Sequence, residues 1–292
     1  MRDFDYYSPH SLKEALSLLE SRQGVAVLAG GTDLMVQMKE RRARPSAVID
    51  VKGVPELNRL NLTETGTLFI GAAVPLARIV SYGQVKSFSP MLFEACSLVG
   101  SWQLRNRATM GGNICNAAPS ADTAPPLLTL SARAIVAGPE GSRPIPMADF
   151  FVGPGKTVIT DKEILLGVEV PPLQGPCGDS YLRHIPRQEM DIAIAGVASL
   201  LLFDGEGVCR EARIALGAVA PTPMRSLRAE SILSGRPLTG QTIEEAAREA
   251  SEEARPISDI RASASYRREM VRVLTKRSIT IAWERHRTGR HQ

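Results

Sequence analysis

The order of apolar and polar residues near the start of the chain predicts a β–loop–α–β unit. Ser11 and Glu14 have the spacing of a helix capping box, and leucines and alanines follow at helical intervals. The apolar run 25–28 predicts a buried strand, 33–41 an amphipathic helix, and 47–51 a second strand. Because doubled glycines stand between the first strand and the helix, this unit has the form of a phosphate-binding site.

Beyond residue 57 the pattern predicts two successive groups of strands and helices. The Pro/Gly-rich stretch 171–176 predicts a linker between them. Strands followed by helices after this linker are typical of a separate α+β domain. The expected strands are 68–74, 132–137, 163–170, 192–203 and 208–219, the last two joined as a hairpin by the turn 204–207. The expected helices are 76–82, 90–99, 225–233, 242–253 and 263–287.

The composition is that of a globular protein long enough for two or three domains. The chain has 292 residues, of which 43% are hydrophobic and 23% charged, and its mean hydropathy is near zero. Its first residues are acidic and polar, unlike a signal peptide, and no apolar run approaches the roughly 18 residues of a membrane span. We therefore expect a cytoplasmic protein with no membrane span.

Charge does not predict a nucleic-acid partner. The formal net charge is +4, and the basic excess gathers in the last 25 residues or so at helical spacing, which is typical of a solvated helix face. Aromatic residues, which a reader of single-stranded nucleic acid would place among the basic ones, make up only 5% of the chain.

The cysteines and histidines do not predict a metal site. The four cysteines show no CxxC spacing, and the four histidines form no HxxxH or HExxH pair. We expect buried free thiols and no iron–sulfur cluster held by this chain alone. The cysteines are Cys96, Cys115, Cys177 and Cys209.

Two segments with doubled glycines carry the chemistry. The first glycine segment, 29–33, reads Ala-Gly-Gly-Thr-Asp, and the second, 109–113, reads Thr-Met-Gly-Gly-Asn. Glycine lets the backbone approach a ligand closely, and successive N–H groups in such loops can form a nest for an anion. Two such loops, with hydroxyl, amide and carboxylate side chains beside them, predict one polyanionic ligand held from two sides.

The ligand is further restricted by what the two segments lack. Neither fits GxGxxG or GxxxxGK[ST], so the Rossmann fingerprint and the P-loop are excluded as written. Asp122 would repel a pyrophosphate, so we expect it to accept from sugar hydroxyls or ring N–H groups, or else to cap a surface helix. No Ser/His/Asp or Cys/His set is evident, which favours a redox cofactor that carries its own chemistry.

At these residues the sequence resembles the FAD-binding medium subunits of molybdenum-containing hydroxylases, the carbon monoxide dehydrogenase and xanthine dehydrogenase family with a PCMH-type FAD-binding domain. The likeness extends in order through about residue 285. It rests on the segments 28–34, 109–116, 119–122, 163–166 and 190–193.

The resemblance implies an α+β fold with two FAD-binding subdomains, at 1–57 and 58–174. A C-terminal α+β domain with a small antiparallel sheet and helices would follow at 177–287, and 288–292 would be a tail. The two glycine segments and their neighbours would hold the FAD pyrophosphate. The implied cofactor-binding residues are Val27, Leu28, Ala29, Gly30, Gly31, Thr32, Asp33, Leu34, Val99, Thr109, Met110, Gly111, Gly112, Asn113, Asp122, Leu165 and Arg183. The family often has lysine where this chain has Arg183, and an arginine there keeps the charge but changes the hydrogen-bond geometry of that contact.

The resemblance also implies a function as an electron relay. A large partner subunit would hold the molybdenum cofactor and a small one the [2Fe–2S] clusters, in a heterotrimer that pairs into a dimer. This chain would contribute FAD and no catalytic residue. Two alternatives stay open: a self-contained flavin oxidase of the vanillyl-alcohol-oxidase type, and a nucleotide-binding or scaffold module without redox activity.

Overall fold

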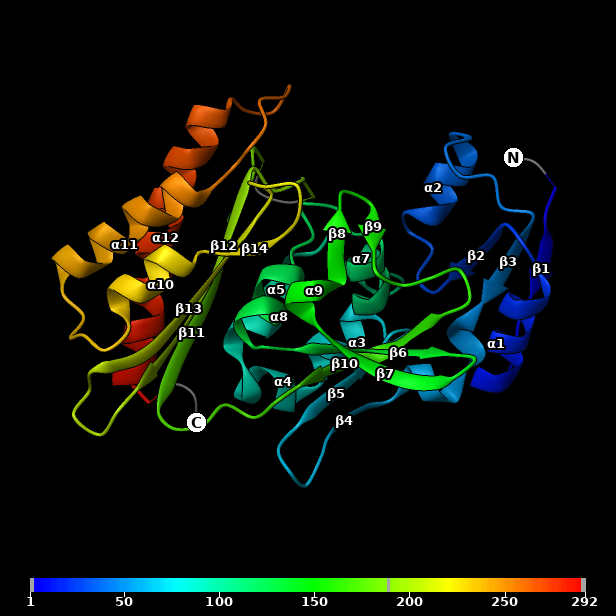
Figure 1. Ribbon diagram of the computed structural model, residues 1–292, viewed down its shortest axis with the longest axis horizontal. Coiled ribbons are helices and arrows are strands. Elements are labelled where there is room, and N and C mark those ends of the chain that lie inside the picture. Colours follow the sequence, from blue (N-terminus) through cyan, green and yellow to red (C-terminus); the bar gives the residue numbers. More distant parts are fainter. Residues whose placement is uncertain (1–2, 188–189, 290–292) are drawn as a thin grey trace.

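The computed structural model describes residues 3–187 and 190–289 and sets three main sheets along its long axis (Figure 1). At one end lies a parallel sheet with the strand order β1–β3–β2. The pairing of β2 with β3 confirms the predicted β–loop–α–β unit. The elements of this part are β1 (Asp5–Tyr7), α1 (Leu12–Ser21), β2 (Val25–Leu28), α2 (Leu34–Lys39) and β3 (Ala47–Asp50).

Helix α1 begins where the sequence places its cap. The Ser11 Oγ accepts a hydrogen bond from the Glu14 N–H at 3.2 Å, as predicted. The Glu14 carboxylate accepts from the His10 N–H at 2.9 Å, one residue before the N-cap. The reciprocal half of the capping box is therefore displaced by one residue.

The central sheet has five antiparallel strands in the order β4–β5–β10–β6–β7. Its three inner strands match predicted ones, whereas the two edge strands were not predicted because they are short or carry prolines. The strands are β4 (Leu60–Leu62), β5 (Leu68–Gly71), β6 (Arg133–Gly138), β7 (Gly141–Pro146) and β10 (Ile164–Val170), with a small pair, β8 (Phe151–Gly153) and β9 (Lys156–Thr157), beside them. The helices are η1 (Val51–Gly53), η2 (Pro55–Asn58), α3 (Leu76–Ser81), α4 (Gly83–Phe88), α5 (Pro90–Leu98), α6 (Trp102–Arg105), α7 (Met110–Cys115), α8 (Ala124–Thr129) and α9 (Met147–Phe150).

The C-terminal part is an antiparallel sheet covered on its outer face by helices (Figure 1). The long helix α12 packs closely on β11, where a Cβ on Gly178 would lie 1.8 Å from the Ala282 carbonyl oxygen. The predicted hairpin and the three predicted helices are confirmed. The elements are β11 (Cys177–His184), β12 (Ala195–Phe203), β13 (Cys209–Gly217), β14 (Met224–Arg225), α10 (Leu227–Leu233), α11 (Gly240–Glu253) and α12 (Ala264–Arg287).

The inner face of this sheet packs on α5 and α8 through a buried polar strip. Asp179 on β11 accepts hydrogen bonds from the Ser89 hydroxyl and from the Met91 N–H (3.2 Å), so it helps to cap the N-terminus of α5. In return, Glu94 on α5 accepts from the Tyr181 N–H at 3.1 Å and forms an ion pair with Arg285. Strand β11 therefore joins the two halves of the chain.

Two elements differ from the sequence-based expectation near the site. The second glycine segment was predicted as a loop with an anion nest, but it is the first turn of helix α7. Neither of its glycines has a positive φ, which a nest of this kind requires, so the nest prediction is wrong there. Strand β11 was not predicted at all, because its polar residues face a partner element rather than solvent.

Among the described residues, no helix is long and apolar enough to cross a membrane, and no group of three His, Cys, Asp or Glu side chains could hold a metal ion. The four cysteines are free thiols. The expectation that all are buried is wrong for Cys115, which is exposed, and for Cys177, which is half-buried. The predicted tail lies partly outside the described residues, since 290–292 are not among them.

Candidate functional site

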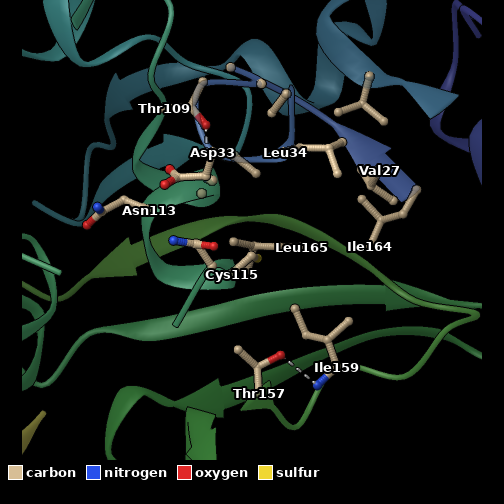
Figure 2. A pocket seen from close by; sticks show the side chains of 18 of the residues that line it. Val27, Asp33, Leu34, Thr109, Asn113, Cys115, Thr157, Ile159, Ile164 and Leu165 are labelled. Atoms are coloured by element: carbon tan, nitrogen blue, oxygen red, sulfur yellow. Dashed lines mark hydrogen bonds between the residues drawn. The ribbon is translucent and has the colours of Figure 1, made fainter. Parts of the chain in front are cut away.

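A cavity of about 510 Å³ opens between the parallel sheet and the central sheet, and both glycine segments line it (Figure 2). Its walls come from β2, the start of α2, α7 and the start of β10. The structure thus brings together residues that lie far apart in the sequence. The expected site residues that line it are Val27, Ala29, Gly30, Gly31, Thr32, Asp33, Leu34, Val99, Thr109, Gly111, Gly112, Asn113 and Leu165.

The first glycine segment turns sharply between β2 and α2. Gly31 has φ of +74°, a left-handed conformation that favours glycine. Gly30 meets a different demand, because a Cβ there would lie 2.3 Å from the carbonyl oxygen of Arg107 and 2.9 Å from the Ala108 Cα. The missing side chain of Gly30 therefore lets this turn lie directly against the backbone that leads into the second segment.

The second glycine segment begins helix α7 at the cavity. Thr109 is the N-cap, and its Oγ1 accepts a hydrogen bond from the Gly112 N–H at 2.9 Å. A Cβ on Gly111 would lie within 2.6 Å of the Ala72 backbone, so Gly111 allows α7 to pack on the end of β5. A Cβ on Gly112 would crowd the Thr109 hydroxyl at 3.1 Å but would meet no other atom within 4 Å beyond its chain neighbours and its own helix, so apart from Thr109 the backbone at Gly112 is accessible from the cavity.

The cavity suits an anionic ligand at this side. The N-terminal ends of α2 and α7 both face it, and such ends carry free N–H groups and a partial positive charge. A side-chain hydrogen bond from Gln37 Nε2 to Asn116 Oδ1 (3.3 Å) links the two helices across it. Neither of these two residues was predicted, although Gln37 lies one helical turn after Asp33, on the face of α2 toward the cavity.

Asp33 occupies the N-cap position of α2 but makes no side-chain capping bond. Its side chain lies near Thr109 and Asn113 in Figure 2, in the wall of the cavity. A carboxylate would repel a phosphate placed directly on it, so Asp33 suits a ligand that offers hydroxyl or N–H donors beside its phosphates.

Apolar and polar side chains share the rest of the cavity wall, which Thr157, Thr160, Asp161 and Glu163 also line. Val27, Ile164 and Leu165 face the cavity, together with Ile159 from the turn between β9 and β10 (Figure 2). That turn was not predicted as part of the site, since nothing in its local pattern places it across from β2. It is held by Glu163, whose carboxylate binds Arg143 and accepts from the Thr160 N–H; the Arg143 guanidinium lowers the pKa of Glu163 to about 2.

Four expected residues do not line the cavity. Met110 is fully buried in the core, and Leu28 packs beside Gly31. Asp122 and Arg183 form a buried ion pair with an Oδ2–NH1 distance of 2.5 Å, and the Tyr181 hydroxyl donates to the other carboxylate oxygen at 2.7 Å. Burial raises the pKa of Asp122 above its usual range, although Arg183 and Tyr181 lower it. The Arg183 Nε is buried without a hydrogen-bond partner in the structure.

Comparison with known proteins identifies the family. Residues 2–173 match the model of the FAD binding domain in molybdopterin dehydrogenase. The chain belongs to the FAD-binding medium subunits of molybdenum hydroxylases. Residues 180–282 match the C-terminal domain of the CO dehydrogenase flavoprotein.

Relatives of this family match the whole chain. It is 35% identical to the xanthine dehydrogenase FAD-binding subunit of Escherichia coli O157:H7, over 96% of this chain and 97% of that one. It is 34% identical to the carbon monoxide dehydrogenase medium chain of Hydrogenophaga pseudoflava, over 97% and 98%. Among solved structures, carbon monoxide dehydrogenase from the same organism superposes with a TM-score of 0.93 at 33% identity, covering 97% and 98% of the two chains.

The α+β fold and the C-terminal antiparallel sheet expected from the sequence are thereby confirmed. The chain is an FAD-binding subunit of the oxidoreductase class. The residues that line the cavity fit FAD. Donor-rich helix ends face one side of the cavity, Gly112 permits close approach of a ligand to the backbone, and apolar and polar side chains share the remaining wall.

Proposed function

We propose that this chain binds FAD between the two glycine segments and works as the electron-relay subunit of a multi-subunit molybdenum hydroxylase. The observation that carries the proposal is the contact of Gly30 with the Arg107 backbone, because it makes two distant segments line one cavity. A diphosphate of the kind FAD carries could be held by both segments at once.

The residues of the chain have positioning roles in this proposal. The N-terminal ends of α2 and α7 hold the pyrophosphate with backbone N–H groups, and charge-assisted bonds of this type contribute about 1.5–3 kcal/mol each. Asn113 adds an amide donor, while Val27 and Leu165 exclude water from the part of the wall that they form. Bound FAD supplies electron exchange in steps of one or two, which matches one-electron clusters to a two-electron acceptor.

Residues outside the cavity belong to the proposal as well. We infer that Asp122 and Arg183 lie around the flavin ring with Val99 of the cavity wall, while Leu28 and Met110 act by packing behind the glycine segments. The unpartnered Arg183 Nε supports this placement, because a buried guanidinium N–H is normally bonded. We also propose the domain boundaries 57/58 and 174/177, which the family resemblance implies.

The partners of the proposed relay are a large subunit with the molybdenum cofactor and a small subunit with [2Fe–2S] clusters, in a heterotrimer that pairs into a dimer. The names of the relatives support this, since two are called medium chains of dehydrogenases. Among the described residues, no three His, Cys, Asp or Glu side chains lie close enough together to hold a metal ion.

Two experiments test the proposal. The purified full chain, freed of flavin and titrated with FAD, should bind one equivalent and show the flavin spectrum, which dithionite should bleach. A chain that takes up no FAD would overturn the binding proposal. Expression with its neighbouring genes should yield a complex containing molybdenum and iron, whereas turnover of a substrate by the isolated chain would favour the self-contained oxidase instead.

A further inference from the structure

Thr123 is the N-cap residue of α8, but its hydroxyl cannot accept the hydrogen bond that an N-cap side chain normally accepts from the helix backbone. The side chain of an N-cap threonine normally accepts a hydrogen bond from the N–H of the second or third helical residue. In α8 these residues are Pro125 and Pro126, which have no N–H. Accordingly, Thr123 makes no side-chain capping bond, although it is fully buried.

The Thr123 hydroxyl is instead bonded to a residue of the cavity wall. Its Oγ1 donates to the Asn113 Oδ1 at 2.6 Å, across ten residues of sequence. This bond occupies the acceptor end of the Asn113 amide. The Nδ2 end, which carries two N–H donors, is left for a ligand in the cavity that Asn113 lines.

We propose that Thr123 is a positioning residue, which fixes the Asn113 amide so that it presents donors and not its carbonyl oxygen to bound FAD. The inference rests on the proposed function, namely that FAD binds in this cavity. A free asparagine amide can rotate by half a turn at little cost, and the wrong orientation would set a carbonyl oxygen against an anion. In the rotated orientation the Asn113 Nδ2 would donate to the Thr123 oxygen, and the buried hydroxyl proton would have no acceptor among the described residues, so the hydroxyl favours the orientation in which Oδ1 faces it.

The segment that carries Thr123 is itself held in place by the C-terminal sheet. Its neighbour Asp122 is bound by Tyr181 and Arg183 on β11, and the Pro119 carbonyl accepts from the Ala218 N–H at 2.7 Å. The hydroxyl therefore reaches Asn113 from a rigid support that lies outside the cavity. Hydrogen bonds join β11 to Asp122, a peptide bond joins Asp122 to Thr123, and a hydrogen bond joins Thr123 to Asn113.

The test is the FAD affinity of full-length variants, measured by flavin fluorescence quenching on the flavin-free chain. Thr123→Val keeps the shape and removes the hydroxyl, so the dissociation constant should rise about tenfold, which corresponds to about 1.4 kcal/mol. Thr123→Ser keeps the hydroxyl and should bind within about twofold of the wild type. If Thr123→Val does not fold, Thr123→Ala gives the same comparison with a smaller side chain.

A matched control separates positioning from general loss of stability. Thr129 is another buried threonine at the other end of α8, and its hydroxyl donates to the Pro126 carbonyl at 2.8 Å. Thr129→Val also removes a buried hydroxyl, so it should lower the melting temperature while leaving the FAD affinity unchanged. Equal loss of FAD affinity in both variants would show that Thr123 has no specific role.

A double-mutant cycle tests whether Thr123 acts through Asn113. In the Asn113→Ala background there is no amide to orient, so Thr123→Val should cause no further loss of affinity. Additive losses, or wild-type affinity of Thr123→Val alone, would overturn the inference. Failure of the wild type to bind FAD would instead overturn the proposed function, so the two outcomes are distinct.

Discussion

The two glycine pairs look alike in the sequence but meet different physical demands. In each pair, one glycine permits a backbone contact: Gly30 with the Arg107 carbonyl and Gly111 with Ala72. Their neighbours differ, since Gly31 takes a left-handed conformation in a turn, whereas Gly112 is helical and borders open space. A repeated motif in one chain therefore need not be a repeated structure, and substitutions at the four positions should have unequal effects.

The largest effect is expected for Gly30→Ala. The new methyl group would lie 2.3 Å from a backbone carbonyl oxygen that cannot move aside easily, so the two glycine segments must separate. We expect a loss of about 3 kcal/mol of unfolding free energy, together with loss of bound flavin. Denaturant unfolding and flavin content measure both. Gly83→Ala is the control, because a Cβ there meets nothing within 4 Å; equal behaviour of the two variants would contradict the comparison.

Gly112→Val should affect binding far more than stability. The side chain projects into the cavity and keeps the pyrophosphate from the α7 N-terminus, so FAD affinity should fall about 100-fold. Valine is no worse than glycine within a helix, so the unfolding free energy of the flavin-free chain should stay within about 1 kcal/mol of wild type. Titration and unfolding of the same preparation provide the measurement. Unchanged flavin occupancy would count against the site.

Gly31→Ala should have a smaller effect, mainly on stability. An alanine with φ near +74° costs about 1–2 kcal/mol, and the nearest atom to its methyl group is the movable end of the Leu28 side chain. Gly31→Asn is the matched variant, since asparagine tolerates this conformation better and should recover part of the loss. The order of the three melting temperatures is the observation to make, and an alanine variant as stable as wild type would refute the argument.

The smallest effect is expected where only side chains join the two segments. Gln37→Ala removes the 3.3 Å hydrogen bond to Asn116, which is partly exposed and contributes about 0.5–1 kcal/mol. We expect FAD to dissociate a few times faster, with unchanged folding, in stopped-flow measurements of flavin release. Gln103→Ala on the exposed surface of α6 is the control.

Local patterns predicted the elements that stand on either side of the site. The inner strands of the central sheet and the helix 263–287 follow from apolar spacing, because each buries one face or both. The strand 25–28 also forms where predicted, but the expectation that it is buried is wrong, since its residues are half-buried and Val27 is exposed in the cavity wall. The composition of both glycine segments also indicated a polyanion site. The family resemblance then supplied FAD, which no local rule could distinguish from other phosphate-bearing ligands.

What the sequence did not predict depends on contacts between distant residues. The sequence of strand β11 contains the polar residues Asp179, Tyr181 and Arg183, so its pattern does not predict a buried strand. In the structure these side chains are buried because they bond to another part of the chain. The second glycine segment reads as a loop, because helix propensities disfavour Gly-Gly and ignore the Thr109 cap. Gln37, Asn116 and the turn before β10 join the cavity only through tertiary packing.

The carboxyl of Asp179 is buried between β11 and α5, so the contact between the C-terminal sheet and the rest of the chain depends on pH. Burial raises its pKa from 3.8 to about 7, against hydrogen bonds from Ser89 and Met91 that lower it. The folded chain then holds this proton more tightly than the unfolded chain. The resulting stabilisation is complete below about pH 4 and is lost as the pH rises through 7. At this one position, folding takes up a proton from neutral solution, and Asp179→Asn would abolish that uptake.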